Sequence, residues 1–259
     1  MNAIFAIAGV VVKEMYRRKD FYVLFVMTAL ITLIMGSVSF FDDKQIVRYV
    51  KELCLVLIWI SSIVIAVTTA ARQIPAEKES RTIFPLLAKP VSRAQLILGK
   101  YVGCLLACGI TLVIFYGFFI IISGSREHVW LMNLYAQAFC MHWAALSIII
   151  AMVLLGSLVF TAQSSNVTIS LCILFGIIFL GKHLNVVASR SAGISSDLLL
   201  GIYYTIPHLD WNWDIQDLLI HNNGVIHWAD VAGAVAYASA YTAVFLGAAW
   251  MIFRKRSLA

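Results

Sequence analysis

The stretch His128–Gly181 reads HVWLMNLYAQAFCMHWAALSIIIAMVLLGSLVFTAQSSNVTISLCILFGIIFLG and contains no Asp, Glu, Lys or Arg in 54 residues. A helix that crosses a bilayer needs about 20 apolar residues, so this stretch is long enough to cross twice. The polar sequence TAQSSN, residues 161–166, lies where the chain would turn between the two crossings. The stretch therefore predicts two consecutive membrane-spanning helices.

The rest of the chain has the same character, because 62% of its 259 residues are hydrophobic and only 12% are charged. Soluble domains are about 45–50% apolar and about 25% charged, and disordered chains are poor in apolar residues, so both classes are excluded. We expect one all-α transmembrane domain, residues 1–259, with six membrane-spanning helices. The expected spans are residues 21–41, 53–71, 97–122, 134–160, 165–187 and 229–253.

The N-terminal segment, residues 1–20, predicts an amphipathic helix that lies in the membrane interface. Its basic residues follow the apolar part instead of preceding it, which is the wrong order for a cleavable signal peptide. The residues expected on the apolar face are Ile4, Ala8, Val11, Val12 and Met15.

The distribution of Lys and Arg predicts the orientation. With a cytoplasmic N-terminus, thirteen of the nineteen basic residues fall on the cytoplasmic side, so we expect both termini in the cytoplasm. The connection 72–96 is then cytoplasmic and the connection 188–228 is external. The net charge of +6 reflects this asymmetry and anionic lipid, and no motif for nucleic-acid binding is present.

The cytoplasmic connection predicts a short, charged helix between the second and third spans. Pro75 suits the first turn of a helix, and Pro90 would stop it, which gives a helix over residues 75–90. Glu77 lies four residues before Arg81 on the same face and can pair with it, whereas Glu79 points elsewhere. Ser92 and Gln95 then predict a capping box that opens the third span.

The external connection predicts short interfacial helices before the sixth span. Ser195–Asp197 is expected to cap a helix over Leu198–Tyr204, which Pro207 ends. The histidines and aspartates of this segment lack a compact ligand spacing, so ordinary interfacial residues are favoured over a metal site. The candidates for contact with an external partner or a substrate are His208, Asp210, Trp211 and Trp213.

Two features argue that the energy for any transport comes from another chain. Gly176–His183 is similar to a phosphate-binding loop, but it has His183 at the position of Ser or Thr and lies in a membrane helix, so we expect no ATP binding here. Ion-driven transporters keep charged or titratable groups within their spans, and the expected span interiors contain only His142. No catalytic residue is predicted.

Three segments between residues 77 and 101, in and just after the cytoplasmic connection, resemble the hallmark sequence of ABC-2 type permeases. These permeases are the membrane subunits of ATP-binding-cassette transporters. The three segments are Glu77-Lys78-Glu79-Ser80-Arg81-Thr82, Leu86–Arg93 and Leu98–Tyr101. The resemblance covers the whole chain. Within the family, the sequence is most similar to the branch that contains the permease serving maturation of nitrous oxide reductase, and the external segment Ile206–Asp210 also resembles that branch.

The resemblance implies a homodimer or a pseudo-dimer of permeases in the bacterial inner membrane, docked on two ATPase subunits that carry the ATP and Mg²⁺. This chain would hold no cofactor itself. It also implies that the residues that couple to the ATPase are Glu77, Glu79, Arg81 and Thr82. Gly99 and Gly103 form a pair of small residues that permits close helix packing, within the chain or between two copies.

Three functions remain open from the sequence. The first is an exporter of a lipid, glycan, peptide or drug. The second is a mechanotransmitter that passes ATP-driven motion to a periplasmic partner, for example in maturation of a metal centre, and moves no substrate itself. The third is a membrane enzyme that uses the external His and Asp residues.

Overall fold

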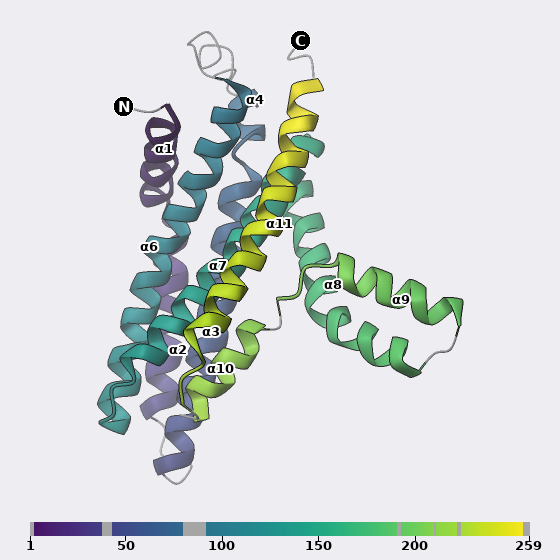
Figure 1. The fold of residues 1–259 in the computed structure, drawn as a ribbon. Helices are drawn as coiled ribbons and strands as arrows, with labels where there is room; N and C mark the ends of the chain where they lie inside the picture. Colours follow the sequence, from purple (N-terminus) through teal and green to yellow (C-terminus); the bar gives the residue numbers. More distant parts are fainter. Residues whose placement is uncertain are drawn as a thin grey trace.

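The computed structural model describes residues 3–37, 43–79, 92–190, 193–209, 211–221 and 224–255. Within these ranges the secondary structure is helical, as expected, and no strand occurs (Figure 1). The helices are α1 (Ala3–Arg17), α2 (Asp20–Ser37), α3 (Asp43–Ala71), α4 (Pro75–Glu79), α6 (Arg93–Glu127), α7 (Met132–Val159), α8 (Gln163–Arg190), α9 (Ile194–Thr205), α10 (Trp211–His221) and α11 (Trp228–Lys255).

Four helical segments in the described part of the chain are long and apolar enough to cross a membrane. They are Ile46–Glu77, Arg93–Glu127, Met132–Val159 and Trp228–Lys255. Two shorter apolar helices, Phe21–Ile34 and Gln163–Phe179, lie in the regions expected for the first and fifth spans. The prediction of an all-helical membrane protein is therefore confirmed, while the six-span arrangement stays a prediction.

Two local predictions about helix boundaries are confirmed. The uncharged stretch 128–181 forms two helices, since α7 ends at Val159 and α8 begins at Gln163. The capping box of α6 is present: the backbone N–H of Gln95 donates to Ser92 Oγ at 3.2 Å, and the backbone N–H of Ser92 donates to Gln95 Oε1 at 2.9 Å.

The predicted cap of the first external helix is wrong. Helix α9 begins earlier, at Ile194, after Gly193, whose φ of 77° is in the left-handed region that favours glycine. Ser195–Asp197 therefore lies inside the helix, and the Ser196 hydroxyl donates to the Ala188 carbonyl of α8 at 2.9 Å. The Ser196 side chain therefore joins α9 to α8 and does not cap α9.

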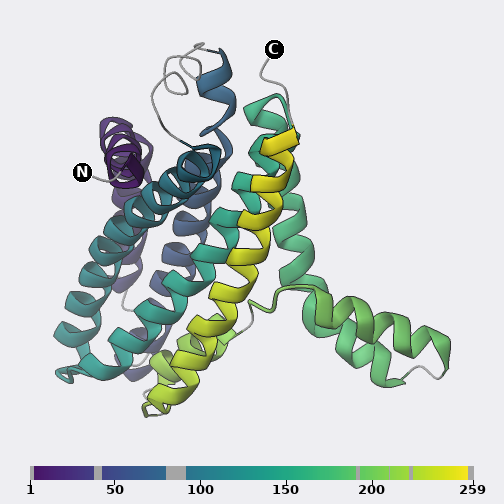
Figure 2. The ribbon, with the colours of Figure 1, turned by 45° about the horizontal axis from the view of Figure 1, so that its top comes forward.

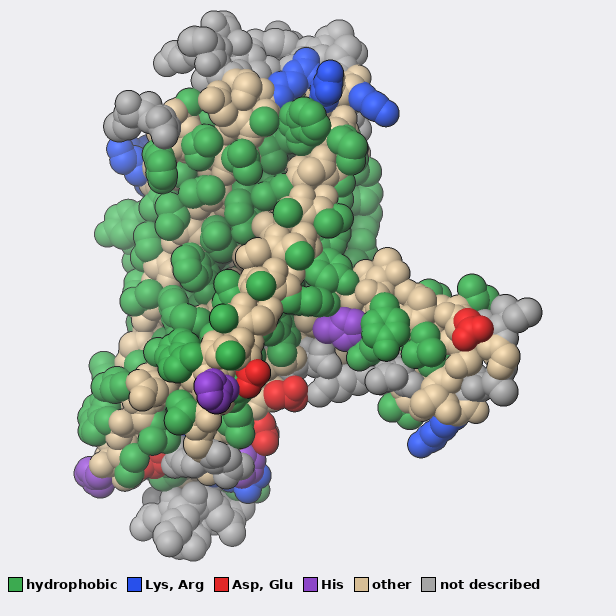
Figure 3. Space-filling model, in the orientation of Figure 1, with side chains coloured by type: hydrophobic (Ala, Val, Ile, Leu, Met, Phe, Trp, Pro, Cys, Tyr) green, Lys and Arg blue, Asp and Glu red, His purple; other side chains and the backbone are tan. Residues whose placement is uncertain are grey.

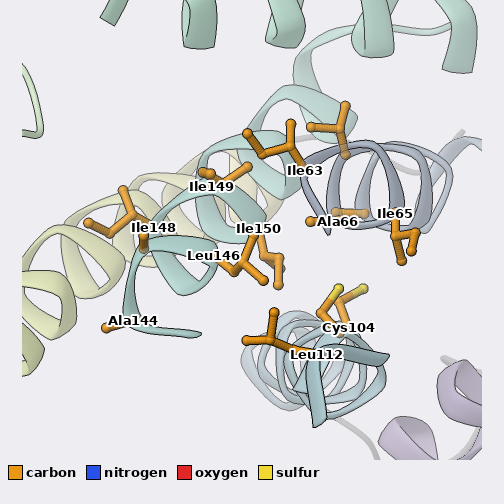
Figure 4. Close-up of a cluster of buried hydrophobic side chains, with 14 of the residues drawn as sticks. Ile63, Ile65, Ala66, Cys104, Leu112, Ala144, Leu146, Ile148, Ile149 and Ile150 are labelled. Carbon is orange, nitrogen blue, oxygen red and sulfur yellow. The ribbon is translucent and has the colours of Figure 1, made fainter. Parts of the chain in front are cut away.

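The core lies where α3, α6 and α7 meet (Figure 4). Helix α7 is at its centre and contacts α3, α6, α8, α10 and α11. A helix that is apolar on all sides is stable when it is surrounded by other helices or by lipid, and α7 is surrounded by the helices that it contacts. Small residues such as Ala66 and Cys104 face this core and let the helices approach closely.

Helix α1 packs along α6 at one end of the bundle (Figure 1). The predicted amphipathic pattern is confirmed, because Ala8, Val11 and Met15 are buried. On its other side Phe5 and Tyr16 are exposed, so α1 has a second apolar surface that this chain leaves uncovered.

Helix α8 runs along the bundle and then bends away from it, so that its last part and α9 form a lateral arm (Figures 1 and 2). Phe179, Leu198 and Tyr204 are exposed on these two helices. At the same end of the molecule, α10 packs against α3 and α7. The Gln137 side chain of α7 holds the chain just before α11, donating to the Ile226 carbonyl at 2.7 Å and accepting from its N–H at 3.2 Å.

Candidate functional site

Five charged side chains with partners on other helices lie where α3 ends and α6 begins, a region here called the coupling end. They are Glu14, Arg72, Glu77, Arg93 and Lys100. Figure 3 shows most of the visible Lys and Arg side chains at the end of the bundle where α11 terminates. The visible Asp and Glu side chains lie at the opposite end and on the lateral arm.

An ion pair between Lys100 of α6 and Glu77 of α4 is the centre of the coupling end. Lys100 is only 4% exposed, and the Glu77 side chain is 16% exposed, so water screens the pair poorly. The local sequence positions Glu77: α3 unwinds into a turn after Ala71, and Pro75, which lacks an N–H, opens α4. The first turn of α4 then directs the Glu77 carboxylate toward α6.

A second ion pair joins α1 to the end of α3. Arg72 Nη2 lies 3.1 Å from Glu14 Oε1, and the Arg72 side chain is 8% exposed. The neighbouring Gln73 is buried and donates to the Thr69 carbonyl at 3.0 Å, which holds the turn against α3. Both ends of the turn between α3 and α4 are therefore tied to other helices by charged or polar side chains.

Gly99 and Gly103 lie on α6 directly under α1 of the same chain. A Cβ atom on Gly103 would be 2.7 Å from Val11 Cβ and 3.0 Å from the Ala8 backbone. A Cβ on Gly99 would be 2.9 Å from Ile7 Cβ. Within the chain, the two glycines permit the close contact that places α1 beside Lys100.

The remaining helices are attached to the coupling end by two buried or half-buried side chains. Arg93 of α6 donates to the carbonyls of Phe253 at 2.7 Å and Arg254 at 3.0 Å, which are among the last carbonyls of α11. Asn166 of α8 donates to the Ala71 carbonyl at 3.3 Å and to the Val153 carbonyl at 3.2 Å. A displacement at this end would thus reach α8 and α11 as well as α1 and α6.

The structure brings together only part of the predicted coupling set. Glu77 lies in α4 and forms an ion pair with Lys100, and its predicted pairing with Arg81 stays a prediction. Glu79 is the last residue of α4. Arg81 and Thr82 lie outside the described residues, as does most of the expected 75–90 helix.

The predicted external candidates lie at the other end of the bundle. The His208 backbone N–H donates to the Tyr237 hydroxyl at 2.8 Å, and His208 Nδ1 is 3.1 Å from the same oxygen. The Trp211 ring packs edge-on against Tyr237, with 6.1 Å between ring centroids. Trp213 belongs to α10, and Asp210 lies outside the described residues. The contacts of His208 and Trp211 join the start of α10 to α11.

Sequence reasoning did not single out Lys100, Arg72 or Glu14 as site residues. Arg72 and Glu14 entered it only as charges, and Lys100 entered it as a charge and as part of the segment Leu98–Tyr101. Lys100 offers one signal in retrospect, since it follows Gly99 within an apolar segment where a lysine must find a partner. The partner itself depends on the turn after α3, which the sequence does not specify.

Within the core, His142 of α7 has partners of its own. Its Nε2 is 2.8 Å from Ser62 Oγ on α3, and its Nδ1 is 3.4 Å from the Tyr116 hydroxyl on α6. These contacts join three helices at the middle of the bundle. The arrangement is that of a packing residue whose ring nitrogens are hydrogen-bonded.

Several apolar helices long enough to cross a bilayer define a polytopic membrane protein. Residues 8–258 match the model of the ABC-2 family transporter protein, so the chain belongs to that family, as the sequence resemblance predicted. A comparison with curated proteins found no match. The family makes the chain a membrane permease, a transport subunit of an ABC transporter.

Proposed function

We propose that the chain is the six-span permease of a bacterial ABC exporter, driven by a separate ATPase that docks on the coupling helix expected over residues 75–90. The family match over residues 8–258 carries this proposal. ATP and Mg²⁺ would bind to the ATPase, and both termini of the permease would lie on the cytoplasmic side of the inner membrane. The concentration of basic side chains at the coupling end supports this orientation.

The ion pairs of the coupling end supply a route for the motion. When ATP closes the two ATPase subunits, the coupling helix over residues 75–90 would move with them. The Glu77–Lys100 pair would transmit this motion to α6, and the Arg72–Glu14 pair would transmit it to α1. Alternating access requires two arrangements of the packed helices. A ligand bound to another chain can drive it when that ligand favours one arrangement over the other.

A second copy of the chain and two ATPase subunits complete the proposed assembly. The lateral arm and the exposed apolar residues of α2, among them Leu30 and Leu33, leave surface that one copy does not cover. A two-fold dimer would let the two copies enclose a path that one bundle of packed helices lacks.

The alternative is a mechanotransmitter that acts on a periplasmic partner without moving a substrate. The contacts of α10 support it, because α10 packs on α3 and α7 and would follow their motion. Binding of a periplasmic protein that changes with ATP would favour this alternative, whereas ATP-dependent loss of a substrate from the cytoplasmic side would favour export. An enzyme with an external His and Asp site receives the least support, since the family is one of transporters.

Glu79→Lys tests the docking of the ATPase. If Glu79 meets a basic residue of the ATPase, reversing its charge should remove an interface contact of about 2–5 kcal/mol. We expect co-purification of the ATPase to fall sharply, or ATP hydrolysis to continue without transport. Glu52→Lys is a matched control, because Glu52 is exposed at the opposite end of α3. Full association and coupled activity of Glu79→Lys would refute the assignment of this residue.

A further inference from the structure

A long apolar groove lies on the surface between α6 and α11, with α7 as its floor. Its volume is about 740 Å³, within the roughly 300–1,000 Å³ range of ligand pockets. Leu98 and Trp250 line it and are each 40% exposed, so the groove opens sideways toward the surrounding membrane. Small residues of α11, such as Ala243 and Gly247, leave the space.

Three polar side chains that line the groove, Trp143, Ser147 and Thr242, have partners within the protein. Ser147 Oγ lies 3.3 Å from Thr242 Oγ1 and donates to the Ala144 carbonyl at 2.7 Å. The Trp143 indole N–H donates to the Leu105 carbonyl at 3.1 Å. What the groove offers to an occupant is therefore apolar surface, which fits a hydrocarbon and not a polar solute.

The shape of the groove fits a chain that enters from the cytoplasmic end. Val235 and Trp250 both line it and are 15 residues apart in α11, which is about 22 Å at 1.5 Å per residue. One leaflet of a bilayer with a ~30 Å hydrocarbon core is about 15 Å deep. The groove is therefore longer than one leaflet is deep and can hold the full length of an acyl chain.

Positive charge lies at the end of the groove where Trp250 stands. The Arg254 guanidinium is over the Trp250 ring, 5.6 Å from its centroid, and both Arg254 and Lys255 are exposed. Tryptophan and arginine are the side chains that favour the headgroup region of a membrane. A phosphate at this level would meet two basic side chains directly above an apolar slot.

We propose that this groove binds one anionic phospholipid of the cytoplasmic leaflet, with an acyl chain along α11 and its phosphate at Arg254 and Lys255. The proposal uses the orientation given above and does not depend on which substrate the permease moves. A bound lipid would fill the space between α6 and α11, two helices that Arg93 joins only at their cytoplasmic ends.

The test uses the full chain in phosphatidylcholine vesicles that contain a small fraction of a dibrominated lipid, whose bromine atoms quench nearby tryptophans. The emission of Trp250 is obtained as the difference between wild type and Trp250→Phe. We expect brominated phosphatidylglycerol to quench it more strongly than the same fraction of brominated phosphatidylcholine. Arg254→Gln should lower this preference about fivefold, as expected for one basic residue at an anionic surface.

Gly247→Leu tests the groove itself. A Cβ at Gly247 meets no atom within 4 Å, so the leucine should fill the groove without disturbing the fold. Gly117→Leu is the matched control, because Gly117 is equally open but does not line the groove. We expect Gly247→Leu, and Ala243→Leu as a second filling variant, to abolish the preference, and Gly117→Leu to keep it.

Three results would overturn the proposal. Equal quenching by the two brominated lipids would show ordinary contact with the bilayer. A preference for phosphatidylglycerol that survives both filling variants would show a headgroup patch without a groove site. Absence of quenching by either lipid, together with cross-linking of two chains at Ser239→Cys, would show that a second copy occupies the groove.

Discussion

Lys100→Gln should lower the free energy of unfolding by about 3 kcal/mol and uncouple ATP hydrolysis from transport. Removing one partner of a buried ion pair costs about 3–5 kcal/mol, and the low end applies because the Glu77 side chain keeps 16% exposure. The loss of coupling follows from the position of the pair, which joins α4 to α6. Thermal unfolding of the purified permease and transport per ATP in vesicles measure the two effects.

Lys51→Gln is the control for this prediction. Lys51 is 1% exposed and pairs with Glu127 at 3.0 Å at the opposite end of the bundle, so its loss should reduce stability by a similar amount and leave coupling intact. Exchanging the two charges, with Lys100→Glu and Glu77→Lys together, should restore part of the coupling. Equal uncoupling by Lys51→Gln and Lys100→Gln would contradict a special role for the Glu77–Lys100 pair.

Gly103→Leu should detach α1 from α6. A Cβ at Gly103 would lie only 2.7 Å from Val11 Cβ and 3.0 Å from the backbone of Ala8, so the helices would have to separate. Overpacking typically costs about 1–3 kcal/mol, and a contact with backbone leaves little freedom for relief. We expect a lower unfolding temperature and faster proteolysis at Arg17, at the end of α1.

Gly117→Leu on the same helix provides the comparison, because its Cβ would meet no atom within 4 Å. It should leave both the unfolding temperature and the protection of α1 unchanged. If Gly103→Leu behaved like Gly117→Leu, the packing of α1 on α6 described above would be incorrect.

The helical membrane fold could be predicted because it depends on composition and on local signals. An uncharged stretch as long as 128–181 has no alternative to membrane helices, and its polar interruption locates the break between α7 and α8. The capping box at Ser92 was equally local, since all of its hydrogen bonds lie within four residues. The amphipathic pattern of α1 gave its buried face for the same reason.

The candidate site could be predicted only in outline. Charge and proline spacing located the segment after α3, while the pairing of Glu77 with Arg81 stays a prediction, because Arg81 lies outside the described residues. The described contact is with Lys100, 23 residues further on, and it requires the turn that separates α3 from α4. Such an ion pair depends on how α3, α4 and α6 pack against one another, and the spacing of residues along the sequence does not specify this packing.

The lateral arm was missed for a related reason. Residues 165–187 contain too few charges to indicate where the helix leaves the bundle, so the sequence predicts a straight span. In the structure α8 bends, and the hydrogen bond from Ser196 to Ala188 holds α9 back along it. The serine that the sequence assigned to a helix cap serves instead in packing between two helices.

Cysteine cross-linking in native membranes tests the central claim, that the segment after α3 faces an ATPase in the cytoplasm. The background is a chain in which the five native cysteines are replaced, with single cysteines placed by Ser80→Cys or Asn212→Cys. The account predicts that the cysteine at 80 cross-links to an ATP-binding-cassette ATPase and is protected from an impermeant reagent in intact cells, whereas the cysteine at 212 is labelled from outside. Labelling at 80 from outside, or failure of position 80 to capture an ATPase, would contradict it.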